Sequence, residues 1–217
     1  MTEYYGPTPL ATVNRLSIYL RTLEEAQSEG HKYISSKSIA ERNGLTSAQV
    51  RKDLSCFGNF GRKGKGYHIQ SLIQRIRSIL GINRKWNVAI VGLGHLGEAL
   101  AGYKGFQRSG FDIVAIFDID ENKIGKKYNG IPIFHPDDMK KVINRKNIQI
   151  AIISVPASAA KNSIEKLVDA GIEGILNFTD VRVSTKDEFV IKNVNLAGEL
   201  ETIAYYITRP DWQCRGI

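Results

Sequence analysis

The residues best suited to chemistry in this sequence are three glycines spaced as G-x-G-x-x-G. The motif comprises Gly92, Leu93, Gly94, His95, Leu96 and Gly97. An almost wholly apolar segment, residues 87–92, precedes it, and a predicted helix from Leu96 to about Arg108 follows it. In such a strand–turn–helix the first glycine makes the turn, the second lets the backbone approach a pyrophosphate, and the third lets the helix pack closely on the strand. The motif therefore predicts a dinucleotide site, with phosphate at the start of the helix.

An acidic residue stands at the distance that such a site requires. Residues 112–118 are typical of a second strand and end in Asp118, 21 residues beyond Gly97. A carboxylate there would accept hydrogen bonds from the adenosine ribose and repel a 2′-phosphate, which favours NAD⁺ and NADH over the NADP forms. Val155 and Pro156 end a later strand and are expected to face the nicotinamide or its ribose. The alternative is a structural turn with a surface aspartate. His95 is expected to be exposed or to neighbour the phosphate rather than to act as a base.

Residues that a dehydrogenase needs beyond its cofactor site are not evident. Hydride transfer requires a proton donor near the nicotinamide and a group that orients the substrate. The sequence has no Ser-x-x-x-Tyr-x-x-x-Lys arrangement and no Cys/His cluster with metal-ligand spacing. Only some forty residues follow the nucleotide-binding segment, too few for a substrate domain. This favours a protein that reads a dinucleotide, with no catalytic residue and no metal. A dehydrogenase with an accessory basic domain is the rival interpretation.

The surplus positive charge lies entirely in the first part of the chain. The net charge is +8; residues 1–85 hold 14 Lys/Arg and 6 Asp/Glu, whereas residues 86–217 hold 16 of each. A surplus confined to one segment indicates a polyanionic partner, usually nucleic acid. A solubilising surface is the alternative, and the arrangement of the basic residues decides between the two.

Apolar periodicity predicts a helix-turn-helix in this basic segment. Helices are expected at about 9–28, at 36–43 and at 47–57, the last capped by Thr46. The short turn between the second and third helices is typical of a helix-turn-helix, whose second helix enters the major groove. Its outer side chains suit phosphates and bases. They are Ser47, Gln49, Arg51, Lys52 and Ser55.

A glycine-rich basic segment follows the recognition-type helix. Residues 58–69, GNFGRKGKGYHI, are predicted to form a hairpin with Arg62, Lys63 and Lys65 at its tip. A hairpin of this kind is typical of the wing of a winged helix, which fits a narrow groove of negative potential. A solvated basic loop is the alternative. We expect double-stranded DNA as the partner.

The remaining elements alternate between strand and helix. Strands are expected at 131–134, 148–155 and 174–178, with helices near 137–144 and 158–170. The predicted fold is α/β with an α+β N-terminal module: a winged helix-turn-helix domain (1–80), a linker (81–86), a Rossmann doubly wound parallel sheet (87–192), and a C-terminal helix and tail (193–217). Apolar residues line one stripe of a helix at 193–207, which would pack on its own sheet or on a partner subunit. Helix-turn-helix proteins commonly bind palindromes as two-fold dimers, which favours the partner.

Composition places the protein in a reducing compartment. The two cysteines, Cys56 and Cys214, argue against a disulfide scaffold, and no signal peptide or membrane span is evident. A cytoplasmic protein is therefore expected. Cys56 lies at the recognition-type helix, so a thiol-based redox repressor is a further alternative; a buried structural cysteine is the expectation.

The whole chain resembles the Rex family of redox-sensing transcriptional repressors. The resemblance rests on SAQVRKDLSCFGNFG, GRKGKGY, LGINRKW, VGLGHLGEALAGYKGF and AGIEGILNF followed by NLAGEL. It implies a homodimer with an exchanged terminal helix that binds palindromic operators and is released by NADH. By position it implies that Tyr103 lies near the nicotinamide. It also implies that Arg15 couples the domains with the start of the last helix, Asn195 and Leu196. The family often has an acidic residue where this chain has Asn195, so a neutral hydrogen bond would replace the salt bridge with Arg15 that the resemblance implies.

Taken together, these features predict a dimer that binds its operator when NADH is low. NAD⁺ and NADH differ by one charge on the nicotinamide. An apolar pocket would reject the cationic ring, because burying a charge without a partner is costly. NADH would then favour an arrangement in which the two recognition helices no longer match successive major grooves.

Overall fold

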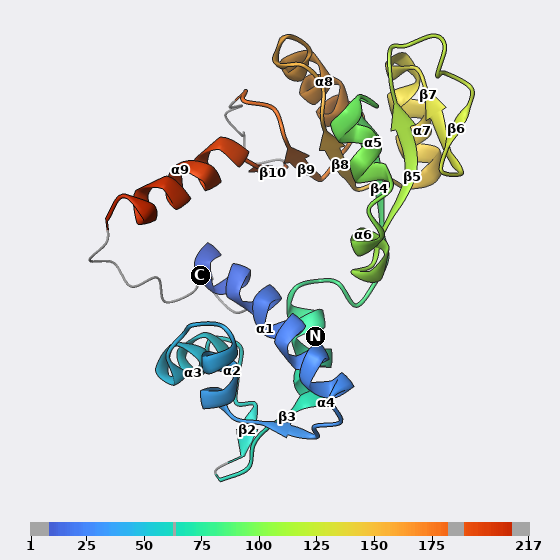
Figure 1. Ribbon diagram of the computed structural model, residues 1–217. Helices are drawn as coiled ribbons and strands as arrows, with labels where there is room; N and C mark the ends of the chain where they lie inside the picture. The colour runs from blue at the N-terminus through green and yellow to red at the C-terminus, as the bar shows by residue number, and fades with distance from the viewer. Residues whose placement is uncertain (1–8, 63, 182–188, 210–217) are drawn as a thin grey trace. The chain divides into compact units, whose positions relative to one another are not determined.

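The computed structural model describes residues 9–62, 64–181 and 189–209, which fall into two compact units (Figure 1). The first comprises residues up to Asn83 together with the segment from Tyr206, and the second comprises Arg84–Tyr205. Each unit is described by itself. Among the described residues, none of the helices combines the length and the apolar character needed to cross a membrane.

The first unit is a small helical module with a three-stranded sheet. Its elements are α1 (Leu10–Ser28), β1 (Tyr33–Ile34), α2 (Ser36–Arg42), α3 (Ser47–Ser55), β2 (Gly61–Arg62), β3 (Gly66–His68) and α4 (Ile69–Ile79). Leu16, Leu23, Ile39, Val50 and Ile76 are fully buried in one apolar core, so α1, α2, α3 and α4 pack together. The predicted helix-turn-helix is confirmed. The third helix ends at Ser55, before the predicted Phe57.

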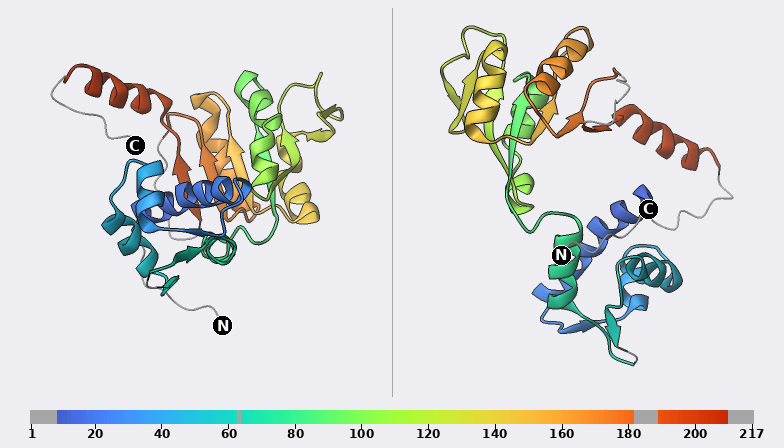
Figure 2. Two further views of the ribbon diagram at one scale, coloured as in Figure 1. Left: turned by 60° about the horizontal axis from the view of Figure 1, so that its bottom comes forward. Right: turned by 180° about the vertical axis from the view of Figure 1, so that it is seen from behind.

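A β-hairpin follows α3, as predicted. The antiparallel strand order is β1-β3-β2, with Ile34 opposite Tyr67 and Arg62 opposite Gly66. The hairpin extends beyond the helices at the foot of Figure 1 and in the right view of Figure 2. Together these elements form a winged helix-turn-helix.

The second unit is a seven-stranded sheet. Its strands are β4 (Trp86–Val91), β5 (Phe111–Phe117), β6 (Lys127–Tyr128), β7 (Ile131–Phe134), β8 (Ile150–Ile153), β9 (Gly174–Asn177) and β10 (Val190–Asn193). The order is β10-β9-β8-β4-β5-β7-β6, and only the β6–β7 pairing is antiparallel. The six parallel strands therefore have the doubly wound order of a Rossmann sheet, as predicted.

Helices cover both faces of this sheet. They are α5 (His95–Ala101), α6 (Lys104–Arg108), α7 (Met139–Lys146) and α8 (Ala157–Asp169), with a short 3₁₀ turn at Pro136–Asp138 before α7. Ala89 and Val91 of β4 pack against α7 and α8, whereas Val88 and Ile90 pack against α5 and α6. Burial on both faces explains the nearly continuous apolar sequence of β4.

One predicted helix is two helices in the structure. The expectation of a single helix from Leu96 to about Arg108 is wrong, because the chain breaks at Gly102 and Tyr103 and α6 begins at Lys104. Tyr103 has an extended backbone, and its ring packs edge-on against Phe106 with 5.1 Å between centroids. Gly105 makes room for this ring, since a Cβ there would collide with it.

The C-terminal helix begins later than expected. Residues 190–193 form β10, which pairs with β9, so α9 (Leu196–Ile207) starts three residues beyond the predicted boundary. No residue of α9 is buried in this chain, and the exposed fraction of Leu200 reaches 68%.

Candidate dinucleotide site and nucleic-acid interface

The glycine motif forms a tight turn between β4 and α5. Gly92 has φ +92°, and a Cβ there would lie 2.8 Å from the carbonyl oxygen of Ser154. A Cβ on Gly97 would collide with the carbonyl oxygen of Gly92, so the start of α5 lies directly on the turn. Both positions therefore exclude any other residue without backbone movement. A Cβ on Gly94 would meet no protein atom within 4 Å, so the outer side of the turn is open to a ligand.

Asp118 holds this turn through the main chain. It directly follows β5, where its Oδ2 accepts a hydrogen bond from the backbone N–H of Leu93 at 2.6 Å and its Oδ1 accepts one from Asp120 at 2.8 Å. On the other side, Lys123 Nζ donates to the carbonyl oxygen of Leu93 at 2.8 Å. The predicted ribose acceptor is thus also a positioning residue for the glycine turn. Sequence reasoning did not detect Lys123.

Ser154 is a second residue that the motif analysis missed. Its Oγ donates to the carbonyl oxygen of Gly92 at 2.9 Å, from the end of the neighbouring strand β8. Val155 is half-buried, with its side chain over Gly92, and Pro156 is exposed at the start of α8. Because β4, β5 and β8 are parallel, the glycine turn, Asp118 and Val155 meet at one edge of the sheet. This edge contains the point where strand order reverses, which is where such sheets bind nucleotides.

The remaining motif residues differ in exposure. Leu93 is buried beneath the turn, whereas His95 and Leu96 are exposed at the start of α5. Among the residues that the structure describes, no three His, Cys, Asp or Glu side chains gather as metal ligands.

Tyr103 lies away from this edge within the chain. It follows α5, whose other end carries the glycine turn, and α5 is about 10 Å long at 1.5 Å per residue. Its side chain is 57% exposed and lines a cavity of about 470 Å³ together with Phe106, Phe111, Asp112 and Asn129. Phe111 begins β5, so this cavity lies toward the opposite edge of the sheet. The structure does not bring Tyr103 to the other predicted cofactor residues.

The recognition-type helix α3 presents a polar face. Thr46 Oγ1 accepts a hydrogen bond from the backbone N–H of Gln49 at 3.2 Å, which is the predicted N-cap. Arg51, Lys52 and Ser55 are exposed, and Ser47 is half-buried. Arg51 Nη1 donates to Ser36 Oγ at 3.2 Å, and Ser55 Oγ donates to the carbonyl oxygen of Lys52 at 2.8 Å.

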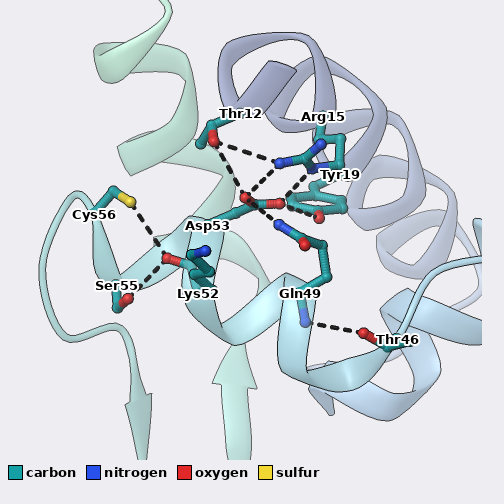
Figure 3. Close-up of polar contacts among 9 residues, drawn as sticks. All are labelled: Thr12, Arg15, Tyr19, Thr46, Gln49, Lys52, Asp53, Ser55 and Cys56. Atoms are coloured by element: carbon teal, nitrogen blue, oxygen red, sulfur yellow. Dashed lines mark hydrogen bonds and ion pairs between the residues drawn. The ribbon is translucent and has the colours of Figure 1, made fainter. Parts of the chain in front are cut away.

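Gln49 turns the NH₂ end of its amide toward a buried carboxylate. Its Nε2 donates to Oδ1 of Asp53 at 2.8 Å, one turn along α3 (Figure 3). Asp53 is 1% exposed and also accepts hydrogen bonds from α1: Arg15 Nε at 2.6 Å and Nη2 at 2.8 Å, Tyr19 Oη at 2.7 Å, and Thr12 Oγ1 at 3.2 Å. We call Thr12, Arg15, Tyr19, Gln49 and Asp53 the Asp53 cluster. The sequence offers one signal for this cluster, because the acidic Asp53 lies beside the inward positions Val50 and Leu54.

The Asp53 cluster keeps its carboxylate ionised. Burial raises the pKa of Asp53, but hydrogen bonds from Arg15, Tyr19 and Gln49 lower it, and the net shift is below the ordinary value of 3.8. Burial and the hydrogen bond to Asp53 raise the pKa of Tyr19, so its hydroxyl remains a donor. The hydrogen bond to Asp53 raises the pKa of Arg15. The cluster is therefore a charged pair with neutral donors around it.

The wing supplies further basic residues. Lys65 is exposed on the hairpin between β2 and β3, and Arg62 ends β2. Of the predicted wing residues, Lys63 lies outside the described residues, as does the side chain of Arg62.

Cys56 is not a buried structural cysteine, so that expectation is wrong. It caps the end of α3 and is exposed, with Sγ donating to the carbonyl oxygen of Lys52 at 3.4 Å (Figure 3). The helix ends one residue before Cys56, and Phe57 instead enters the core.

The residues at the start of α9 serve their own helix in this chain. Asn195 Oδ1 accepts a hydrogen bond from the backbone N–H of Gly198 at 3.0 Å, and Leu196 is exposed. Arg15, the predicted coupling partner of Asn195, is bound to Asp53.

Comparison with known proteins identifies the family. A family model described as "CoA binding domain" matches residues 83–181, and one described as "Putative DNA-binding protein N-terminus" matches residues 8–55. A "Redox-sensing transcriptional repressor Rex" from Carboxydothermus hydrogenoformans is 44% identical over 201 residues, which cover 93% of this chain and 97% of that protein. The chain belongs to the Rex family of redox-sensing transcriptional repressors.

Solved structures of a Rex-family protein have the same fold. RSP in complex with NAD⁺ and operator DNA matches with a TM-score of 0.88 and 35% identity, covering 93% of each chain. RSP in complex with NADH matches with a TM-score of 0.84 and 34% identity, covering 93% of this chain and 94% of that one. These Rex structures place a nicotinamide dinucleotide and operator DNA on one fold.

Proposed function

We propose that this chain is a homodimeric repressor that binds palindromic operator DNA and leaves it when NADH binds. The observation that carries the proposal is the combination, in one chain, of a glycine turn open on its outer side and a capped recognition helix with a wing. The RSP complexes with operator DNA, NAD⁺ and NADH support it. Residues 1–80 would bind DNA, 87–192 would bind the dinucleotide, and 193–217 would contribute to the dimer.

The dinucleotide would lie along the open side of the glycine turn. The backbone from Gly92 to Gly97 would face the pyrophosphate, and Asp118 would accept hydrogen bonds from the adenosine ribose. The Asp118 carboxylate already accepts two backbone N–H groups. A carboxylate has about four lone-pair sites, so this use leaves acceptors for hydroxyl groups. Val155 and Pro156 would line the nicotinamide end, and Tyr103 would approach it in the dimer.

The DNA would be contacted by α3 and the wing. Ser47, Gln49, Arg51, Lys52 and Ser55 would face the major groove, and Arg62, Lys63 and Lys65 would follow the backbone or the minor groove. Arg51, Lys52 and Lys65 are exposed cations, and no acidic residue of α3 is exposed, since Asp53 is buried. This charge distribution suits phosphate contacts.

The dimer would form through the apolar side chains of α9. Leu196, Leu200, Ile203 and Ile207 are each more than half exposed in the single chain. A stripe of this kind marks a surface that another protein chain covers. Arg15, Asn195 and Leu196 would then connect the DNA-binding and dimer-forming parts, with the neutral Asn195 giving a weaker contact than a carboxylate.

The test is a titration of operator affinity against each form of the coenzyme. The protein first selects a duplex from a random DNA library, and this duplex is labelled with a fluorophore. Its affinity for the protein is then measured at one fixed salt concentration, because phosphate contacts make affinity strongly salt-dependent. NADH is expected to weaken binding by at least about tenfold, a coupling of roughly 1.4 kcal/mol, whereas NAD⁺ is not. Equal effects of the two forms would contradict the proposal. Sustained turnover of nicotinamide with a small alcohol or acid would favour the dehydrogenase instead.

A further inference from the structure

The Asp53 cluster has a consequence for base recognition that goes beyond stability. The core of the first unit already holds α3 through Val50, Leu54 and Phe57. A buried ion pair is weak evidence for stability, because removing two charges from water offsets much of their attraction. Its directional hydrogen bonds, however, fix the positions of the side chains that make them. In this cluster they tie α3 to one face of α1 and also hold Gln49.

Asp53 determines which end of the Gln49 amide faces outward. A carboxylate can only accept hydrogen bonds, so the NH₂ group of Gln49 must turn toward Asp53. The backbone of Gln49 is fixed as well, through the Thr46 cap. Within the described residues the carbonyl oxygen of Gln49 has no hydrogen-bond partner, and it is not among the buried unsatisfied atoms. It is therefore an accessible acceptor near the start of α3.

We infer that Asp53 is a specificity-determining positioning residue, which locks Gln49 so that its carbonyl oxygen reads a base bearing an amino group. This inference rests on the proposed binding of operator DNA through α3. Residues near the N-terminus of a recognition helix contact base edges, and Gln49 is the third residue of α3. In the major groove the amino donors are N6 of adenine and N4 of cytosine. A glutamine whose amide is free to rotate could pair with either a donor or an acceptor on the base. The locked glutamine presents only its carbonyl oxygen and therefore pairs only with a donor.

The experiment measures base preference rather than affinity alone. The full-length protein selects duplexes from a random library, and the selected duplex is then altered one base pair at a time, symmetrically in both half-sites. Four proteins are compared: wild type, Gln49→Met, Asp53→Asn and Thr12→Val. Asparagine at position 53 offers a donor as well as an acceptor, so it no longer dictates the orientation of Gln49. Thr12→Val is the matched control, because it removes the hydrogen bond from Thr12 to Asp53 and the longer one from Arg15 to Thr12 but leaves the carboxylate and Gln49 in place.

We expect wild type and Thr12→Val to prefer an amino-bearing base at one position by about fivefold per half-site, the value of one hydrogen bond of roughly 1 kcal/mol. Gln49→Met and Asp53→Asn are expected to lose that preference while other positions keep theirs. A purely structural role would weaken binding to every duplex and leave the preference unchanged.

Several outcomes overturn the inference. It fails if Gln49→Met keeps the preference, if Asp53→Asn loses affinity evenly across duplexes, or if Thr12→Val loses the preference as well. Circular dichroism checks that Asp53→Asn is folded. If it is not, the comparison of base preference between Gln49→Met and Thr12→Val decides whether Gln49 reads the base. If the wild type recovers no duplex, the proposed function itself fails and the inference falls with it.

Discussion

Two aspartates hold the functional elements of the two units, and they do so by different means. Asp118 is half-buried and accepts backbone N–H groups of Leu93 and Asp120. Asp53 is buried and accepts hydrogen bonds from four side chains, one of them the guanidinium of Arg15. A turn held through its main chain depends on its glycines and on the side chains of Asp118, Lys123 and Ser154 that bond its backbone. A helix held through side chains depends on the charge of the central carboxylate and of the guanidinium paired with it. The nucleotide element should therefore respond to steric changes, and the DNA element to changes of charge.

The largest expected effect is steric and concerns the glycine turn. Gly97→Val places side-chain atoms against the carbonyl oxygen of Gly92, so the turn must shift away from Asp118. Forced backbone movement costs up to about 3 kcal/mol, which corresponds to a loss of NADH affinity of roughly a hundredfold. Titration of NADH fluorescence measures it.

A matched change at Gly94 separates packing from ligand contact. Gly94→Ala meets no protein atom, so it is expected to leave stability unchanged while reducing NADH affinity by crowding the pyrophosphate. Operator binding without NADH should be that of wild type in both variants. Undiminished NADH affinity in Gly97→Val would show that the turn is not the dinucleotide site.

An effect of comparable size is expected for Asp53. Asp53→Ala leaves Arg15 without its carboxylate and Tyr19 without an acceptor, and breaking a buried pair costs about 3 kcal/mol. Asp118→Ala removes hydrogen bonds to two backbone N–H groups at a half-buried site, and we expect about 1–2 kcal/mol. Site-resolved hydrogen exchange measures each loss within its own unit. Equal losses of stability in the two variants would contradict the distinction between Asp53 and Asp118.

The pH dependence of α3 is expected to follow the charge of Asp53. The pKa of Asp53 lies below 3.8 in the folded protein, mainly because Arg15 and Tyr19 outweigh the effect of burial. A lowered folded-state pKa contributes stability above the unfolded pKa and loses it as the pH falls through the folded pKa. Hydrogen-exchange protection of α1 and α3 should thus fall below about pH 3.8. Asp53→Asn should lack this dependence; if it behaves like wild type, another carboxyl group is responsible.

The sequence predicts these elements unequally, for physical reasons. Apolar periodicity and glycine spacing depend on local order, so they located α1, α3, β4 and the turn from Gly92 to Gly97 within a few residues. The break at Tyr103 depends on how one aromatic ring packs, and the Asp53 cluster depends on contacts 34 to 41 residues apart in the chain. Neither follows from a periodic pattern. Asp118 was predicted as the last residue of a strand and directly follows β5, but its bond to Leu93 depends on the paired register of β4 and β5.

The smallest expected effect is at Cys56, which tests whether redox sensitivity belongs to the nucleotide element alone. Cys56 is exposed at the end of α3, and among the described residues its side chain makes one hydrogen bond, from Sγ to the carbonyl oxygen of Lys52. Serine can make the same bond, so Cys56→Ser is expected to change stability by less than about 0.5 kcal/mol. Release from operator DNA by NADH should stay within about twofold of wild type, a difference of roughly 0.4 kcal/mol. Ser55→Ala is the matched control, because Ser55 bonds the same carbonyl oxygen. If Cys56→Ser abolished the response to NADH while Ser55→Ala preserved it, the thiol at the end of α3 would be the redox sensor. The assignment of redox sensing to the nucleotide-binding turn that Asp118 holds would then be wrong.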